Sequence, residues 1–189
     1  MSEFFVDPTL YTGREGDRSE IGSKQRAIYD ILDALEISYF RADHEHADTI
    51  ADCAAIEEIL GAKICKNLFL RNRQATEFYL LLMPGDKPFR TAVVSKLLGV
   101  ARLSFAEPEY LEQYLDLTPG SVTVLGLAKD PEHKVQLLID RDVADEEWLG
   151  CHPCLNTSTI RLRTADVFDK FLKHTGHEAK ILEIPYPEA

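Results

Sequence analysis

The sequence lacks any long apolar run. No stretch of its 189 residues approaches the roughly 18 consecutive apolar positions that a membrane helix needs. Residues 1–7 hold no basic segment followed by an apolar core, so we expect no secretory signal. Four cysteines are too few for the disulfide framework of a small secreted domain. These absences predict a cytoplasmic protein that does not enter a membrane.

The sequence also lacks the motifs of several enzyme classes. It holds no Walker loop, no GxGxxG stretch and no GxSxG elbow. Ser121 follows Pro119-Gly120, but nothing marks a His/Asp partner for it. If the chain is an enzyme, we expect it to work by positioning groups around a bound substrate.

Positive charge is scarce outside one segment. The net charge of -11 argues against indiscriminate nucleic-acid binding. Residues 61–103 nevertheless hold eight Lys or Arg against only Glu77 and Asp86, so this segment carries +6 and the remainder -17. Such a segment either meets a polyanion at one face of the protein or forms a pair of exposed strands.

The hydrophobic spacing predicts a mixture of helices and strands with hairpins and few βαβ units, which favours an α+β fold with a mixed, mostly antiparallel sheet. Ser23 and Thr164 are expected N-caps, Thr49 or Asp48 another, and residues 148–153 an expected loop. The predicted helices cover residues 24–36, 49–60, 91–98, 108–115 and 165–174. The predicted strands cover residues 37–41, 63–71, 77–83, 101–105, 134–140, 157–162 and 179–184. We expect an N-terminal extension over residues 1–22 and one domain over 23–189.

The predicted strand that begins at Lys66 is the centre of this organisation. Its residues alternate, with Leu68 and Leu70 on one face and Phe69 on the other, which indicates one fully buried side. Lys66 lies where the chain enters the strand. It is placed either for an anion at the mouth of a cleft or as a solvated lysine at a strand end.

The cysteines and histidines leave three alternatives open. Cys151-His152-Pro153-Cys154 is a CxxC motif, with Cys53 and Cys65 elsewhere, so zinc binding, dithiol chemistry or incidental thiols are all conceivable. Only one tight cysteine pair is present, and the motif leads into a strand rather than a helix. We therefore favour incidental thiols. His152 is suited either to hydrogen-bond a ligand or to hold its own loop.

Four motifs, which occur in this order, resemble the YbaK/ProX (PrdX) family, the free-standing homologues of the editing domain inserted in bacterial prolyl-tRNA synthetase. The similarity covers about residues 24–184. The motifs are Lys66-Asn67-Leu68-Phe69-Leu70-Arg71, Arg102-Leu103-Ser104-Phe105-Ala106, Leu117-Thr118-Pro119-Gly120-Ser121-Val122-Thr123, and His152-Pro153 with Asn156-Thr157.

The resemblance implies a sheet flanked by helices and hydrolysis of an aminoacyl ester on misacylated tRNA, most closely alanine on the tRNA for proline. It implies no metal and no cofactor, with the tRNA's own 2′-OH assisting. The expected partners are the acceptor end of that tRNA and prolyl-tRNA synthetase. A small closed pocket would exclude larger side chains by shape, as a second sieve.

The resemblance also implies residue roles. Lys66 would match the family's essential lysine, which engages the terminal adenosine's phosphate or the ester region, and His152 would match the loop histidine near the aminoacyl group. Gly120 and Ser121 would line the pocket through backbone groups, and Asn156 and Thr157 would support the His152 loop. The other implied substrate-binding positions are Asn67, His44 and Thr49.

Three departures from the family pattern concern the shape of the pocket. Cys151 stands where phenylalanine is common, Val124 where proline is common, and His44 is followed by Glu45-His46 rather than prolines. They leave open a deacylase for serine or cysteine. Two other classes remain as alternatives: a non-catalytic module that binds tRNA or a synthetase, and a CxxC thiol protein.

Overall fold

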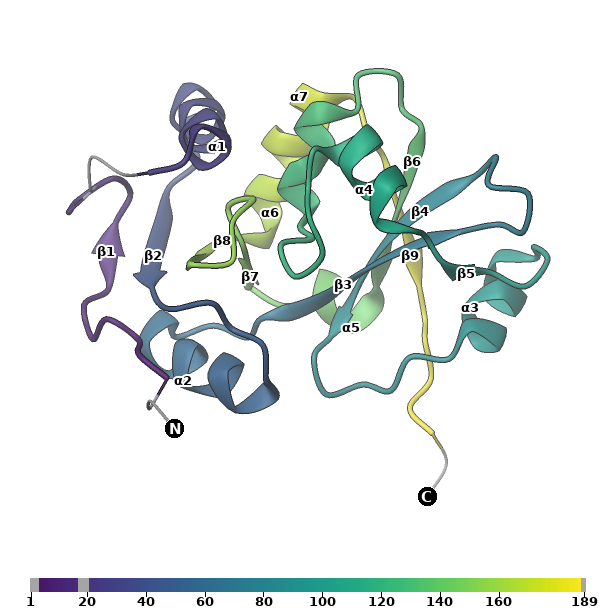
Figure 1. Ribbon diagram of the computed structural model, residues 1–189, viewed down its shortest axis with the longest axis horizontal. Helices are drawn as coiled ribbons and strands as arrows, with labels where there is room; N and C mark the ends of the chain where they lie inside the picture. Colours follow the sequence, from purple (N-terminus) through teal and green to yellow (C-terminus); the bar gives the residue numbers. More distant parts are fainter. Residues whose placement is uncertain (1–3, 17–20, 188–189) are drawn as a thin grey trace.

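Two sheets organise the computed structural model, which describes residues 4–16 and 21–187 (Figure 1). The smaller sheet is antiparallel, in the order β1-β2-β8-β7. The larger sheet has the order β5-β3-β4-β6-β9 and is mixed, because β4, β6 and β9 run parallel. The strands are β1 (Tyr11–Thr12), β2 (Tyr39–Asp43), β3 (Cys65–Arg71), β4 (Phe78–Pro84), β5 (Ser104–Phe105), β6 (Val135–Asp140), β7 (Trp148–Cys151), β8 (Ser158–Arg163) and β9 (Ala179–Leu182).

Helices flank both sheets, which confirms the α+β class. Figure 1 shows α1 and α2 beside the smaller sheet and α3 and α4 beside the larger one. None of the helices in the described residues is long and apolar enough to cross a membrane. The helices are α1 (Ser23–Ala34), α2 (Ile50–Leu60), α3 (Thr91–Leu98), α4 (Pro108–Leu115), the 3-10 helix η1 (Val124–Lys129), α5 (Arg141–Ala144), α6 (Thr164–Asp166), the π-helical turn η2 (Val167–Phe171) and α7 (Leu172–Thr175).

The ends of α2 follow the local signals of the sequence. Thr49 is its N-cap, and a capping box with Asp52 satisfies two backbone N–H groups. Gly61 ends the helix in the left-handed conformation, with φ of 66°. Two other expected caps are wrong. The N-caps are Gly22 and Arg163, and neither makes a capping hydrogen bond with its side chain. Ser23 and Thr164 are instead the first helical residues.

Residues 148–151 form strand β7, so the loop expected over residues 148–153 is wrong for its first part. The strand pairs with β8 along its whole length. Gly150 also approaches the chain of Lys63, where a Cβ atom would lie 2.5 Å from the Lys63 carbonyl oxygen. A strand this short depends on these neighbours rather than on its own four residues.

The prediction that one face of β3 is fully buried is wrong, because each face carries both buried and partly buried residues. Phe69 is 5% exposed and packs in the main core, whereas Leu70 is fully buried in a second core on the opposite face. The interpretation of residues 61–103 as a pair of exposed strands is wrong, because every residue of β4 except its last, Pro84, is buried. Two of its cations are also neutralised, since Arg71 pairs with Glu107 and Lys87 is buried against Asp140.

The described part of the N-terminal segment lies against the smaller sheet. Tyr11 and Thr12 pair with β2. The buried Arg41 guanidinium donates to the carbonyl oxygens of Gly13 and Glu15, at 2.9 and 2.8 Å. The boundary at residue 22 between an extension and a domain stays a prediction.

Candidate active site

A cleft of about 870 Å³ opens beside the start of β3, and we call it the Lys66 cleft. Its walls come from the N-terminal end of α2, the start of β3, the turn after β4, and α5. Lys66 and Thr49, both predicted site residues, line it. So do Cys53, Cys65 and Leu149, which give it an apolar wall.

Lys66 lies half-buried in this cleft. Its Nζ donates a hydrogen bond to the backbone carbonyl of Lys87, in the turn that follows β4. Burial lowers the pKa of Lys66, and the nearby Asp86 carboxylate partly opposes that shift. The ammonium is therefore incompletely solvated and is held by one backbone acceptor.

The wall of the cleft is more acidic than the sequence suggested. Two lysines line it, Lys63 and Lys66, against the carboxylates of Asp48, Glu57, Asp86, Asp142 and Glu146. An anion would meet attraction only near the lysines, whereas a cationic α-amino group would be attracted along most of the wall. The basic segment thus does not make this cleft a basic surface.

A buried threonine links two of the candidate histidines. Thr159 Oγ1 lies 2.8 Å from His44 Nε2 and 3.3 Å from His152 Nδ1. Thr159 is on β8, His44 follows β2, and His152 follows β7, so the antiparallel register brings the three together. We call His44 and His152, which Thr159 links, the histidine pair.

The hydrogen bonds assign the tautomers of both rings. His44 Nδ1 lies 2.6 Å from the Glu45 carbonyl oxygen, and His152 Nδ1 lies 3.0 Å from the Ser158 carbonyl oxygen. A carbonyl only accepts, so both Nδ1 atoms carry the proton. Thr159 then donates to His44 Nε2, and His152 Nε2 remains as an acceptor without a partner in the described part of the chain.

Burial keeps the histidine pair neutral. It lowers the pKa of His152 to about 4, despite the hydrogen bond to the Ser158 carbonyl, and the neighbouring His44 adds to the shift. Burial likewise lowers the pKa of His44. At neutral pH His152 is therefore a hydrogen-bond acceptor and a proton acceptor, not a cation.

Asn156 joins the loop after β7 to the loop after β2. Its Oδ1 accepts from the Ala47 N–H at 3.3 Å, and its Nδ2 donates to the Ala47 carbonyl oxygen at 3.0 Å. Gly120 lies against the same group, since a Cβ atom there would be 3.5 Å from Asn156 Nδ2 and 3.6 Å from the His46 ring. Its φ of 87° also favours glycine.

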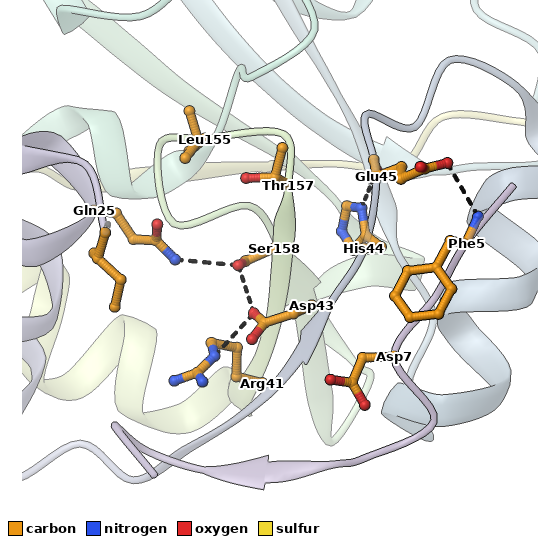
Figure 2. Close-up of a pocket in the computed structure, with 11 residues that line it drawn as sticks. Phe5, Asp7, Gln25, Arg41, Asp43, His44, Glu45, Leu155, Thr157 and Ser158 are labelled. Atoms are coloured by element: carbon orange, nitrogen blue, oxygen red, sulfur yellow. Dashed lines mark hydrogen bonds and ion pairs between the residues drawn. The ribbon is translucent and has the colours of Figure 1, made fainter. Parts of the chain in front are cut away.

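A second, smaller pocket of about 260 Å³ is lined by residues of β2, of the start of β8 and of the N-terminal segment (Figure 2). His44 and Thr157 line it. Its polar groups are occupied by one another: Arg41 Nε donates to Asp43 at 2.9 Å, and Ser158 Oγ donates to the same carboxylate at 2.7 Å. This hydrogen-bonded network joins β2 to β8.

The side chains of two predicted site residues, Ser121 and Asn67, form hydrogen bonds within their own segments. Ser121 Oγ donates to the Thr118 carbonyl oxygen at 2.8 Å, within one tight turn. Asn67 Nδ2 donates to the Cys65 carbonyl oxygen at 3.1 Å. The structure therefore brings His44 and His152 together, puts Asn156 next to Gly120, and puts Lys66 and Thr49 in the cleft. The side chains of Asn67 and Ser121 bond within their own segments.

The cysteines lack the environment of a thiol site. Cys65, Cys151 and Cys154 are buried and unpaired, and burial raises the pKa of each thiol, to about 12 for Cys65 and Cys154. Cys151 ends a strand rather than beginning a helix, and burial raises its pKa although a hydrogen bond with Thr123 partly opposes that shift. Among the described residues, no group of three or more His, Cys, Asp or Glu could hold a metal ion.

Sequence reasoning missed Thr159 and Lys87. Thr159 had a weak signal, because it is a polar residue at an inward position of a predicted strand. Lys87 lies between prolines in a loop, where a solvated lysine is the ordinary expectation.

Comparison with known proteins identifies the class. The chain belongs to the aminoacyl-tRNA editing domain family, whose model matches residues 44–170. The resemblance inferred from the motifs is thereby confirmed, and the protein is an editing hydrolase, an aminoacyl-tRNA deacylase.

Its individual relatives carry names that refer to prolyl-tRNA editing or to prolyl-tRNA synthetase. The chain is 29% identical over 160 residues to the prolyl-tRNA editing protein ProX of Acetoanaerobium sticklandii, covering 85% of this chain and 97% of that one. It is 30% identical over 167 residues to prolyl-tRNA synthetase associated domain-containing protein 1 of Mus musculus, with coverages of 85% and 97%. The solved structure of a candidate trans-editing enzyme for prolyl-tRNA synthetase shares its fold, with a TM-score of 0.60 at 16% identity, over 87% of this chain and 99% of that one.

Proposed function

We propose that this protein is a trans-editing deacylase that removes alanine from tRNA for proline in the cytoplasm. The observation that carries the proposal is the half-buried Lys66 ammonium in a cleft of about 870 Å³. This volume falls within the range of about 300–1,000 Å³ typical of small-molecule sites, so it has room for a terminal adenosine with a small aminoacyl group. Membership of the editing family and the prolyl-tRNA names of the relatives support the choice of tRNA.

In this proposal Lys66 meets the negative charge of the substrate. Its ammonium attracts the terminal phosphate or stabilises the oxyanion that forms when water adds to the ester carbonyl. The carboxylates along the cleft wall attract the protonated α-amino group of the aminoacyl ester. Two lysines among five carboxylates therefore suit a substrate that carries both signs of charge.

In this proposal the histidine pair supplies a hydrogen-bond and proton acceptor. The neutral His152, with Nε2 unprotonated, accepts a hydrogen bond or a proton from the attacking water or the ribose hydroxyl. Collapse of the tetrahedral intermediate breaks the bond between the carbonyl carbon and the ribose oxygen, and a proton returns to that oxygen. An aminoacyl ester is already reactive, so the reaction needs no side-chain nucleophile. Thr49 lines the cleft, and Asn156 and Gly120 hold the loops around the pair.

The experiment measures deacylation of alanyl-, seryl-, cysteinyl- and prolyl-tRNA for proline by wild type, Lys66→Ala and Lys180→Ala. We expect release of alanine alone, a fall of about 100- to 1,000-fold in kcat/KM for Lys66→Ala, and unchanged activity for Lys180→Ala, which removes an exposed lysine on β9. Release of serine or cysteine instead would keep the class and change the substrate. If none is released while the tRNA still binds, the protein is a binding module and the proposal fails.

The partner follows from the substrate. We propose that the protein receives its tRNA from prolyl-tRNA synthetase, with the name of the mouse relative as support. Co-purification of the two proteins with tRNA for proline present would test this.

A further inference from the structure

Lys87 is a buried cation that holds three separate segments of the chain. Its Nζ lies 2.9 Å from Asp140 Oδ2, 2.8 Å from Asp142 Oδ2 and 2.8 Å from the Ile184 carbonyl oxygen. The same Nζ lies 4.4 Å from the centre of the Tyr186 ring. The side chains of Lys87 and Asp140 are 2% and 1% exposed. We call these five residues the Lys87 anchor.

The anchor keeps its charge. Burial alone would lower the pKa of Lys87, but hydrogen bonds and charge from Asp142 and Asp140 raise it overall. The three N–H donors of the ammonium match three acceptors, so no buried donor is left unpaired. A buried ion pair is not in itself more stabilising than apolar side chains of the same volume. Its distinctive effect here is to fix where the turn after β4, the start of α5 and the segment after β9 meet.

The turn that the anchor holds is in direct contact with Lys66. The backbone carbonyl of Lys87 accepts the hydrogen bond from Lys66 Nζ. The turn is closed by the Lys87 N–H, which donates to the Pro84 carbonyl oxygen at 3.2 Å. At Gly85 a Cβ atom would lie 3.2 Å from the Ile64 carbonyl oxygen, so the turn packs tightly against the chain that enters β3.

The anchor also builds part of the cleft wall. Pro84, Gly85 and Asp86, on the turn, line the Lys66 cleft, and so do Asp142 and Tyr186. A displacement of the turn would therefore move both the acceptor of the Lys66 ammonium and the wall beside it.

We propose that Lys87 is a positioning residue, whose buried ammonium holds the turn after β4 so that its carbonyl fixes the Lys66 ammonium in the cleft. The part of Lys66 in turnover rests on the proposed function. The effect of the anchor on the Lys66 ammonium does not, and it can be measured separately.

The first test removes both buried charges together. Lys87→Met/Asp140→Asn leaves no unpaired buried charge, and the asparagine can still accept from the Asp142 N–H, as Asp140 does at 3.2 Å. Asp142→Asn is a second, milder variant, because this side chain is 47% exposed and its loss does not threaten folding. Lys180→Met is the control for a lysine-to-methionine substitution away from the anchor, at an exposed position on β9.

The first measurement is the rate of acylation of Lys66 against pH, by competitive labelling and mass spectrometry. We expect both anchor variants to shift the Lys66 profile to higher pH, toward that of exposed lysines, because a released ammonium becomes hydrated. The control should leave the profile unchanged. An unchanged Lys66 profile in folded anchor variants would overturn the inference, whether or not the protein hydrolyses any tRNA.

The second measurement is kinetic. We expect the double variant to lower kcat/KM for alanyl-tRNA by about 10- to 100-fold, the scale of a misplaced catalytic group. In a Lys66→Ala background the same substitutions should lower the residual rate by less than about twofold, because the anchor acts through Lys66. Equal losses in both backgrounds would mean that the anchor is only structural. A shifted labelling profile in a protein whose wild type releases no amino acid would retain the positioning and refute the proposed function.

Discussion

Replacing Thr159 by valine tests the histidine pair with almost no change of shape. Thr159 is fully buried, and its hydroxyl is 2.8 Å from His44 Nε2. Valine fills the same volume, so no cavity forms. His44 Nε2 loses its donor, whereas His152 Nδ1 keeps the Ser158 carbonyl at 3.0 Å. One buried acceptor is thus left unpaired, at a cost of about 1–3 kcal/mol in the free energy of unfolding.

Urea unfolding measures this cost, with the fluorescence of Trp148, the chain's single tryptophan, as the signal. For a slope of about 2 kcal/mol per molar urea, a loss of about 2 kcal/mol lowers the midpoint by about 1 M. Thr157→Val, an exposed threonine two residues earlier, is the matched control and should change stability by less than about 0.5 kcal/mol. An unchanged midpoint for Thr159→Val would refute the assignment of the hydroxyl as the donor to His44.

Three further predictions concern titration, thiol reactivity and packing. The pKa of His152 is about 4 in the folded protein and about 6.5 in the unfolded chain, so only the unfolded chain binds the proton between these values. Stability should be fully present above pH 6.5 and fall by up to about 3 kcal/mol toward pH 4; a flat series of urea midpoints would contradict this. Iodoacetamide at pH 8 should modify Cys53, which is partly exposed, before the buried Cys151, and peptide mapping that finds the reverse order would revive a thiol role. Phe171→Ala, at a fully buried position in the π-helical turn, should cost about 3–5 kcal/mol in thermal or urea unfolding, and a loss below 1 kcal/mol would mean that the core refills.

The sequence predicted those parts of the fold that depend on interactions between residues close together in the chain. The cap at Thr49 and the stop at Gly61 involve residues within one helical turn, so the sequence pattern sufficed. The hairpin of β3 and β4 was also predictable, since two apolar runs flank a five-residue polar turn. Strand β7 was not, because its four residues are held by pairing with β8 and by the close approach of Gly150 to Lys63.

Site residues could be predicted only where their position within one predicted element was itself unusual. Residues whose partners lie far away in the sequence could not be predicted. Lys66 could be singled out because a lysine at the entrance of a buried strand needs an explanation. Lys87 could not, since its acceptor Asp140 is 53 positions away and only the parallel pairing of β4 with β6 brings them together. Thr159 is similarly 115 positions from His44, and its link to that ring exists only in the folded sheet.

The pairing of β2 with β8 has a consequence for how the protein is made. Asp43 on β2 meets Ser158 on β8, again 115 positions along the chain. At about 5–20 residues per second, a ribosome needs about 6–23 s to synthesise the segment between them. During that interval β2 has no partner on this side, and its exposed edge is a site for pairing with other nascent chains. Ribosome-bound chains ending before β8 should therefore depend on chaperones to stay soluble.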